Sequence, residues 1–353
     1  MTNPVTDSIR ECKLIYNTAV KNESAMILLR SKLAAVSTRL GFPDPKRENI
    51  ALVASEIVSN QIKYAEGKGM IQIWQQPGPA LDIFALDFGP GIPDLRAAEA
   101  DGFSTANTLG KGLGSIHRLS DQACLYSRQE ASGPVRRWSG TAVLARFLPG
   151  ARNRDEAQAS NTPFNIGLYS RALSDDRFCG DRVYLHRDGT KLRWLHLDGL
   201  GHGEEAEKST ANLAALLPRC SGPAALLGAV DKELRHTRGA VAIAGEADAG
   251  SRSLEIIGVG DMHAHFFEQE QCHSFSFAPG VLGKEHKSTA SSRLKFDQHG
   301  LIITASDGIR RNWDTSNFPG LFHGHPQLIA YLLGNIMARI SDDQSLCVVR
   351  QNQ

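Results

Sequence analysis

Apolar residues in the first half of the chain recur with two different spacings. Two long segments repeat them every three or four residues, which is the spacing of a helix with one buried face. The second segment starts near Pro45 and stops before Gly67, and residues of these types are typical of helix boundaries. Shorter runs rich in Val, Ile and aromatic residues are typical of strands. We therefore expect helices over 24–41, 45–67 and near 112–121, and strands over 13–20, 70–75, 81–88, 123–128 and 140–148.

The second half is dominated by strand-like runs and alternation. Helical spacing interrupts the strands in two places and returns once near the end of the chain. The predicted strands cover 164–173, 181–189, 192–199, 241–248, 253–268, 300–308 and 345–351, and the predicted helices cover 203–219, 224–237 and 325–340.

A polar segment over 149–163 separates the two halves. It carries several charges, is flanked by prolines and follows neither helical nor strand periodicity, so we interpret it as a linker. A chain of 353 residues is also longer than one hydrophobic core usually holds. We therefore expect two α/β domains, over 1–148 and 164–353.

Composition excludes several classes of protein. Hydrophobic residues make up 41% and charged residues 22% of the chain, which is ordinary for a soluble globular protein. A net charge of +1 gives no broad attraction to nucleic acid or to an anionic membrane. No apolar run reaches the roughly 18 residues of a membrane helix, and no signal pattern opens the chain. The six cysteines are scattered without a C-x-x-C pair, so we expect reduced thiols in a cytoplasmic protein.

The helix predicted over 45–67 carries Glu56 and Asn60 four residues apart, hence on one face. A carboxylate and an amide in this arrangement can hold a metal ion and position a proton acceptor. Taken alone, the pair is more simply explained as an exposed polar helix face.

Two glycine-rich motifs follow. Asp87 ends a predicted strand and precedes Gly89 and Gly91, which let the backbone approach a flat ligand while the acid accepts a hydrogen bond from an amine. Further on, alternating glycines open a helix, so free N–H groups and the helix dipole face an anion, and a lysine adds a point charge. These residues are Gly110, Lys111, Gly112 and Gly114.

The order and spacing of these motifs, followed by Gly140 and Thr141 at a strand start, resemble the GHKL ATPase family. The segments EIVSNQIKYAEGKGMIQI, DFGPGIPDLRAAEADGFST and GLGSIHRLSD look like the RsbT-type serine/threonine kinases of bacterial stress signalling, which are relatives of the RsbW anti-sigma kinases. The resemblance covers about residues 8–148 and implies the α/β sandwich of that ATPase fold.

By this resemblance, Glu56 would be the catalytic base for a protein hydroxyl, Asn60 would coordinate Mg²⁺, and Asp87 would bind the adenine of ATP. Phosphoryl transfer would then proceed by positioning and charge neutralisation. The remaining ATP-binding positions would be Gly89, Gly91, Gly110, Lys111, Gly112, Gly114 and Thr141.

Short acids stand at strand ends throughout the second half. No matching set of Cys or His accompanies them, and oxygen ligands of this kind suit Mg²⁺ or Mn²⁺. Two such ions can share one carboxylate and activate water for in-line attack on phosphorus. Taken singly, each Asp-Gly pair is more simply a structural turn. The acids are Asp181, Asp198, Asp307, Asp342 and Asp343.

As an ordered set, these acids resemble the metal-dependent serine/threonine phosphatases of type 2C, and in particular the SpoIIE and RsbX branch, over about residues 164–351. That family implies an α-β-β-α sandwich. By the same resemblance, the catalytic Asp198 would bridge two Mn²⁺ or Mg²⁺ ions. Asp181 and the carbonyl of Gly199 would hold one ion, and Asp307 and Asp342 the other. Asp343 remains an alternative to its neighbour.

Other polar residues have simpler explanations. Arg171 and Arg177 are candidates to bind phosphate, but a solvated surface role explains both. The His-x-His pairs in MHAHFF and FHGHP have no evident third zinc ligand, so we interpret them as ordinary core or surface histidines.

The two resemblances together imply a bifunctional regulator that phosphorylates and dephosphorylates Ser or Thr of STAS-domain proteins, which act as anti-sigma-factor antagonists or in stressosomes. An alternative is a phosphatase alone, with the GHKL domain as an ATP-dependent docking, sensor or anti-sigma-like module. We expect no nucleic-acid or membrane partner. Relatives of the first domain often pair, which leaves a homodimer open.

Overall fold

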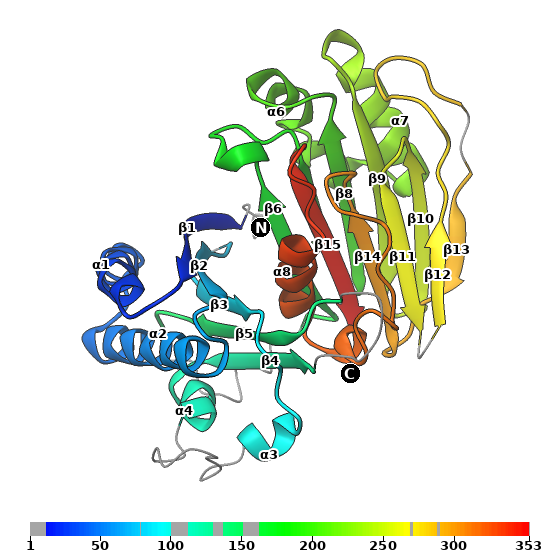
Figure 1. Cartoon of the computed structure of the whole chain (residues 1–353). Helices are drawn as coiled ribbons and strands as arrows, with labels where there is room; N and C mark the ends of the chain where they lie inside the picture. The colour runs from blue at the N-terminus through cyan, green and yellow to red at the C-terminus, as the bar shows by residue number, and fades with distance from the viewer. Residues whose placement is uncertain are drawn as a thin grey trace. The chain divides into compact units, whose positions relative to one another are not determined.

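The computed structural model describes residues 12–77, 79–99, 112–129, 137–150, 162–268, 271–287 and 290–352. The chain divides into two compact units (Figure 1). The first unit comprises the described residues of 12–160 together with Asn317–Gly324. The second comprises the described residues of 161–316 and 325–353. Among these residues, no helix has both the length and the apolar character to cross a membrane.

The first unit is one antiparallel sheet with helices on one face (Figure 1), the expected α/β sandwich. Neighbouring strands follow the order β1-β2-β3-β5-β4. The strands are β1 (Lys13–Val20), β2 (Gly69–Gln75), β3 (Leu81–Asp87), β4 (Gln122–Arg128) and β5 (Gly140–Phe147), and the helices are α1 (Ser24–Arg39), α2 (Asp44–Tyr64), α3 (Leu95–Glu99) and α4 (Gly112–Leu119).

One apolar cluster holds the helices to the sheet. Val53 and Ile57 of α2 pack with Leu33 of α1 and with Ile73 and Ile83 of the central strands, and all five are fully or almost fully buried. Each such side chain contributes about 1.5–3 kcal/mol relative to an exposed one. This seam therefore fixes the rotation of α2, the helix that carries Glu56 and Asn60.

The second unit consists of two five-stranded antiparallel sheets. One has the order β13-β10-β9-β8-β7 and the other has the order β12-β11-β14-β15-β6. The strands are β6 (Phe164–Arg171), β7 (Arg182–Asp188), β8 (Lys191–Gly199), β9 (Ala240–Asp248), β10 (Ser253–Val259), β11 (His263–Glu268), β12 (Gln271–Phe275), β13 (Ser292–Lys295), β14 (Gly300–Ala305) and β15 (Gln344–Gln351).

Helices cover the outer faces of both sheets, which confirms the predicted α-β-β-α sandwich (Figure 1). The helices α6 (Glu204–Thr210) and α7 (Pro223–Glu233) lie on the first sheet, and α8 (Pro326–Ile336) lies on the second. The contact of α8 with β6 is close enough to require glycine, because a Cβ at Gly167 would lie 2.1 Å from the carbonyl oxygen of Pro326.

Two predictions about this unit were wrong, and two strands were missed. The run over 253–268 is not one strand, because Gly260 adopts a left-handed φ of +103° and divides it into β10 and β11, which belong to different sheets. The helix over 203–219 stops at Thr210, since Asn212 has a φ of +62° and a 3₁₀ turn follows. The edge strands β12 and β13 were not predicted, because their exposed, mostly polar residues show no apolar run. Residues 151–161 of the expected linker lie outside the described part of the chain.

Candidate functional site

The turn after β3 holds Asp87 by backbone hydrogen bonds. Its Oδ1 accepts from the N–H of Gly89 at 2.9 Å and from the N–H of Thr141 at 3.0 Å. Burial raises the pKa of Asp87, and these two bonds oppose that rise. Both bonds end on Oδ1, and neither engages Oδ2.

Glycines are required around Asp87 for a steric reason. Gly140 has a φ of +144°, and a Cβ there would lie 2.1 Å from the carbonyl oxygen of Asp87. Gly91 has a φ of +76°, and its Cβ would lie 2.3 Å from the carbonyl oxygen of Arg128. The motif glycines therefore let β3, β4 and β5 meet closely at the end of the sheet where Asp87 lies.

Ser127 on β4 is a residue that the sequence did not indicate. Its hydroxyl accepts a 2.7 Å hydrogen bond from the N–H of Ile92 and donates to the carbonyl of Gly140 at 3.1 Å. It also lies 3.1 Å from the hydroxyl of Thr141. Ser127 thus fixes the glycine-rich loop against the start of β5, and only the strand register reveals this, since it pairs Ser127 with Thr141.

Glu56 and Asn60 lie on α2, both half-buried. The end of this helix adjoins the Asp87 turn, because a Cβ on Gly89 would lie 3.0 Å from the Cβ of Ala65. Helix α4 packs along α2 and begins with Gly112 and Gly114 in its first turn, while the predicted Gly110 and Lys111 lie outside the described residues. The elements that carry the motifs therefore border one region, at the end of α2 and the start of α4.

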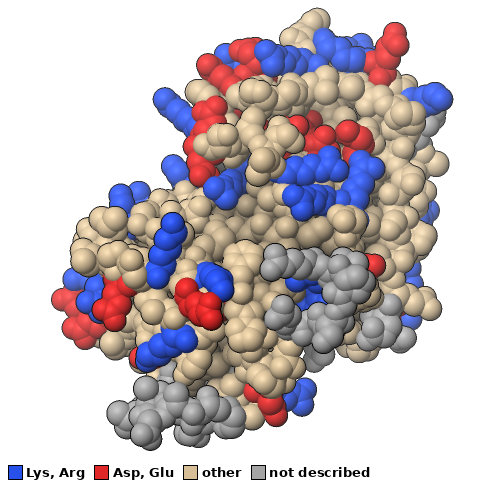
Figure 2. Space-filling model, viewed as in Figure 1, with Lys and Arg blue, Asp and Glu red and all other residues tan. Residues whose placement is uncertain are grey.

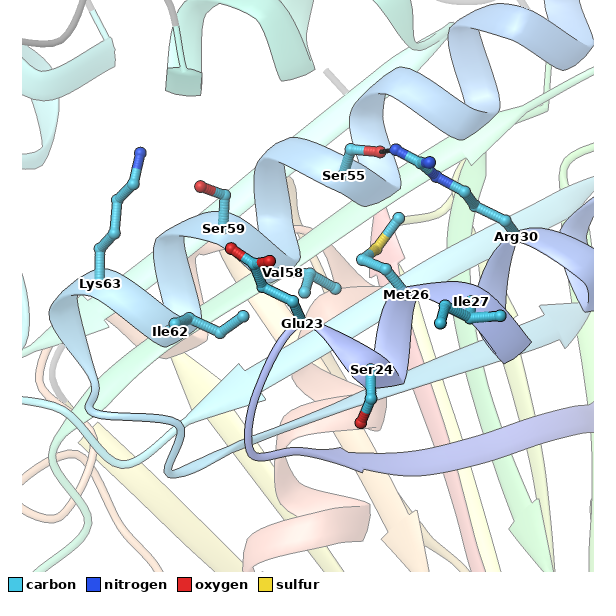
Figure 3. A pocket seen from close by; sticks show the side chains of 10 residues that line it. All are labelled: Glu23, Ser24, Met26, Ile27, Arg30, Ser55, Val58, Ser59, Ile62 and Lys63. Carbon is cyan, nitrogen blue, oxygen red and sulfur yellow. Dashed lines mark hydrogen bonds between the residues drawn. The ribbon is translucent and has the colours of Figure 1, made fainter.

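A groove of about 620 Å³ lies elsewhere on the first unit, between α1 and α2 (Figure 3). Ser55, Val58, Ser59 and Ile62 form its α2 wall, and the guanidinium of Arg30 donates a 3.3 Å hydrogen bond to Ser55. Glu56 and Asn60 are not among its lining residues. Helix α2 therefore presents one face to the motif residues and another to this groove.

In the second unit, Asp181 and Asp198 meet at the end of the β7–β8 ladder. Arg182 pairs with Leu197 in the antiparallel register, so the preceding Asp181 lies beside Asp198. The N–H of Gly199 donates to the carbonyl of Gly180 at 3.2 Å and closes this end of the ladder.

Asp307 and Asp342 meet in the same way on the other sheet. Ala305 of β14 pairs with Leu346 of β15, and the N–H of Ser306 donates to the carbonyl of Ser345 at 3.2 Å. Asp307 follows the end of β14, and Asp342 precedes the start of β15. Each sheet of the sandwich therefore contributes two of the predicted acids.

Electrostatic coupling shows that the two pairs share one environment. Burial raises the pKa of Asp198 well above its ordinary value, and the charges of Asp181, Asp307 and Asp342 raise it further. Burial also raises the pKa of Asp307, with Asp342 as a second cause. Such mutual repulsion is what a cluster of acids experiences, and a divalent cation relieves it.

Asp181 provides the test of whether these residues fit a metal ion. Its side chain is 3% exposed, and burial raises its pKa to about 7, against the hydroxyls of Ser306 and Ser345, which lower it. Its Oδ2 accepts a 2.7 Å hydrogen bond from Ser345, whereas its Oδ1 is buried with no hydrogen-bond partner among the described residues. A buried carboxylate oxygen without a donor is costly, and an all-oxygen set of this kind suits Mg²⁺ or Mn²⁺. The residues fit such an ion.

The acid cluster does not form a complete set of metal ligands in this structure. Among the described residues, no three acid, His or Cys side chains already converge as a complete ligand set around one point. Binding an ion by three or more of these acids would therefore require their side chains to move.

Asp343 has a different role from Asp342. Its Oδ1 accepts from the N–H of Leu173 at 2.7 Å and its Oδ2 accepts from the N–H of Gly180 at 2.6 Å. Both oxygens are therefore occupied by the backbone of the segment that leads to Asp181. This favours Asp342 over Asp343 as the acid that faces a ligand.

In both Asp-Gly pairs, close packing of the backbone requires the glycine. A Cβ on Gly199 would lie 2.6 Å from the carbonyl oxygen of Ala206, and a Cβ on Gly308 would lie 1.8 Å from that of Asp343. Each glycine lets the backbone behind an acid pack directly against a neighbouring segment, and this sets the position of the acid.

Asp261 is an acid that the sequence analysis missed. Its charge raises the pKa of both Asp198 and Asp307, so it lies near the cluster. It follows Gly260 at the break between β10 and β11, and that break was hidden inside the run predicted as one strand.

Basic side chains border the acids (Figure 2). Figure 2 shows Asp and Glu side chains in a recess of the second unit, beside a band of Lys and Arg side chains. Arg311 and Arg339 lie close enough to lower the pKa of Asp307, and Arg311 donates to the carbonyl of Asp261. These arginines, which the sequence did not single out, supply the positive charge at the cluster.

The remaining candidates have structural partners. Arg171 forms a two-pronged ion pair with Asp175, at 2.6 and 2.8 Å, and the guanidinium of Arg177 lies 5.4 Å from the ring centre of Phe178. His263 and His265 are buried on β11 with ring nitrogens 3.3 Å apart, and burial lowers their pKa values to about 3 and about 4. Both are core histidines.

Solved structures resemble the chain only moderately. A chain solved in work on the bacterial stressosome and secondary messenger signalling is 24% identical, with a TM-score of 0.49 over 53% of this chain and 99% of that one. RsbX in complex with magnesium is 17% identical, with a TM-score of 0.48 over 54% and 96%. The SpoIIE phosphatase domain with a regulatory fragment, from Bacillus subtilis, is 15% identical, with a TM-score of 0.43 over 93% and 95%. At such TM-scores we assign no activity from these likenesses.

The first unit has a relative of higher sequence identity. Residues 20–138 match the pattern of the histidine kinase-like ATPase domain. The serine/threonine-protein kinase RsbT of Bacillus subtilis (strain 168) is 42% identical over 95 residues, which make up 26% of this chain and 71% of that protein. Through this part of its sequence, the chain belongs to the RsbT family of histidine kinase-like ATPases.

Proposed function

We propose that the chain is a partner-switching regulator that both phosphorylates and dephosphorylates Ser or Thr on a STAS-domain protein. The domains would be residues 1–148 and 164–353. The observation that carries the second activity is the unpartnered, buried Oδ1 of Asp181 within a cluster of mutually coupled acids. The first activity rests on the RsbT relationship and on the presence of Glu56 and Asn60.

In the first domain, the residues would transfer the γ-phosphoryl group of ATP to a hydroxyl of the partner. Asp87 would accept a hydrogen bond from the adenine amine through Oδ2. Glu56 would take the proton from the partner's hydroxyl. Mg²⁺, when bound beside Asn60, neutralises charge on the phosphates. The start of α4 would offer its N–H groups to those phosphates.

In the second domain, the acids would hold two divalent ions. Asp198 would lie between the ions, with Asp181 and the Gly199 carbonyl on one side, and with Asp307 and Asp342 on the other. Such ions, when bound, supply Lewis acidity and activate water for in-line attack on phosphorus. As water joins the phosphorus, the bond from phosphorus to the Ser or Thr oxygen would break. That oxygen would take up the proton lost by the water, and inorganic phosphate would be released.

Joining two opposed activities in one chain would favour a shared target and would require control over which activity operates. A linker raises the effective concentration of each activity at a shared target. Because simultaneous operation would only hydrolyse ATP, we propose that nucleotide or partner binding favours one activity at a time.

The test incubates the purified full chain with ATP, Mg²⁺ or Mn²⁺ and a STAS-domain protein encoded near it, and compares wild type with Asp198→Ala. Accumulation of phosphorylated partner only in the variant supports two opposed activities. If neither protein forms phosphorylated partner, yet wild type alone clears partner that was phosphorylated beforehand, the first domain is a docking or sensor module. If wild type clears none, the phosphatase half of the proposal is wrong.

A further inference from the structure

A continuous chain of hydrogen bonds runs through the interior of the second unit and ends on Asp181. His196 on β8, which is 0% exposed, lies at its centre. The Nδ1 of His196 lies 2.8 Å from the Thr304 hydroxyl on β14, and its Nε2 lies 2.7 Å from the Ser345 hydroxyl on β15. Ser345 in turn donates to Asp181 Oδ2 at 2.7 Å. The chain thus connects the two sheets and reaches the acid cluster.

With Asp181 ionised, as a bound cation would hold it, the direction of every proton in this chain is determined. An ionised Asp181 can only accept, so Ser345 gives it the single hydroxyl proton. Ser345 then accepts from His196, which fixes the neutral ring as the tautomer with its proton on Nε2. Nδ1 is left as an acceptor and receives the hydroxyl proton of Thr304. All four groups are satisfied along the chain, and the one atom left over is Asp181 Oδ1.

His196 stands where packing alone calls for an apolar residue. Its neighbours Leu195 and Leu197 point to the opposite face of β8 and pack in the core beneath α7. His196 points inward between the two sheets, among fully buried residues. An imidazole in such a place is costly unless both ring nitrogens are bonded. The fold satisfies both, and does so with a hydroxyl that also holds Asp181.

We propose that His196, through Ser345, is a positioning residue for Asp181, fixing Oδ2 so that Oδ1 faces the divalent ion. This inference rests on the proposed metal-dependent function of the second domain. Without the histidine, the Ser345 hydroxyl can turn away from Oδ2, which leaves the Ser306 hydroxyl to act on this carboxylate. Outer-shell partners of this type change metal affinity by roughly 10–100-fold when they are removed.

The experiment titrates Mn²⁺ alone into the full chain by calorimetry, after chelator treatment, and records urea unfolding of the same proteins. The variants are His196→Leu, Ser345→Ala, the double variant and His196→Gln, which keeps an N–H donor near the position of Nε2. The matched control is His265→Leu, since His265 is also buried and bonded to a serine, Ser274, at 3.0 Å.

We expect His196→Leu and Ser345→Ala each to weaken Mn²⁺ binding by roughly 10–100-fold. The double variant should be no weaker than the weaker single variant, because both remove the same chain. His196→Gln should recover most of the affinity, and His265→Leu should lower stability while leaving affinity unchanged. Ser345→Ala, which removes one atom, keeps the test decisive if His196→Leu fails to fold.

Three results would overturn the inference: no Mn²⁺ binding by wild type, unchanged affinity in both single variants, or additive losses in the double variant. Failure of the proposed function looks different. If wild type binds Mn²⁺ but hydrolyses no phosphorylated protein, the proposed phosphatase activity is wrong. The Mn²⁺ affinities of the variants still decide the role of His196.

Discussion

The backbone N–H of Gly180 donates a 2.6 Å hydrogen bond to the carboxylate of Asp343, 163 positions further along the chain. This bond ties the residue before Asp181 to the residue after Asp342. The two adjacent acids therefore differ, since both oxygens of Asp343 accept from distant backbone, whereas Asp342 Oδ1 accepts from the N–H of its neighbour Asp343 at 2.9 Å.

Replacement by alanine should affect stability at Asp343 and phosphatase activity at Asp342. Asp343→Ala leaves the N–H groups of Leu173 and Gly180 without their acceptor, so we expect the free energy of unfolding to fall by about 3 kcal/mol. Asp342→Ala should barely change stability and should lower phosphatase activity by at least roughly 100-fold. Urea denaturation and hydrolysis of a phosphorylated STAS protein measure the two effects. Equal stability losses in the two variants would contradict this division.

The raised pKa of Asp181 should lower the stability of the metal-free chain as the pH rises from about 4 to about 7, in opposition to the buried histidines, whose lowered pKa values favour the folded state as the pH rises. The pKa of Asp181 is raised to about 7 in the folded protein, from an ordinary value of 3.8. In this window the folded state binds a proton that the unfolded state does not, so each pH unit costs up to about 1.4 kcal/mol. Urea unfolding in chelator at pH 5 and pH 8 measures the slope.

The matched control for the pH prediction is Asp181→Asn, whose slope should differ from that of wild type by up to about 1.4 kcal/mol per pH unit toward greater stability at higher pH. Saturating Mn²⁺ should shift the wild-type slope toward greater stability at higher pH, because metal binding displaces the proton. Equal slopes in the two metal-free proteins would show that Asp181 is ionised and paired in some other way.

Asp87→Asn should separate ATP binding from folding. The amide oxygen of the variant can still accept from the N–H groups of Gly89 and Thr141, so the melting temperature should hardly move. Loss of the charged acceptor should weaken ATP binding roughly 10–100-fold, as measured by calorimetry. Gly140→Ala is the contrasting change, since its Cβ would collide with the carbonyl of Asp87, and it should lower the melting temperature. Unchanged ATP affinity in Asp87→Asn would remove its adenine-binding role.

Glu56→Ala should abolish phosphorylation without abolishing ATP binding. Loss of a general base lowers the rate by roughly 10²–10⁴-fold. Glu48→Ala is the matched control, because Glu48 is an exposed acid two turns earlier on α2, and it should leave the rate unchanged. Transfer of radiolabelled phosphate to the STAS partner is the measurement. An unchanged rate in Glu56→Ala would favour a docking role for the first domain.

Most elements, and the acids that end strands, were predictable because each is encoded locally. The helix over 45–67 has its own boundary residues, and Asp198 and Asp307 are each followed by glycine. The structure adds the reason for those glycines: the backbone of another segment packs against each one too closely for a side chain. Local chemistry therefore identifies an acid at a strand end, but not the partner that holds it.

Residues that act through distant partners were not predictable. Ser127, Ser345 and His196 lie within ordinary strand sequences, and only the pairing of strands far apart in the chain gives them roles. Asp261 was missed for a related reason, because the apolar run around it conceals a change of sheet at Gly260. Hydrophobic periodicity shows which face of a strand is buried, but it does not show where the chain passes from one sheet to the other.

The glycines behind the two strand-end acids have a consequence for how this chain tolerates mutation. At Asp198 and Asp307 a substitution would remove a proposed metal ligand and leave the surrounding backbone in place. At Gly199 and Gly308 any side chain meets a carbonyl oxygen, so a substitution removes the fold and with it the acid's position. A deep mutational scan that reads protein abundance and phosphatase output separately should therefore lose only output at the two aspartates and both signals at the two glycines.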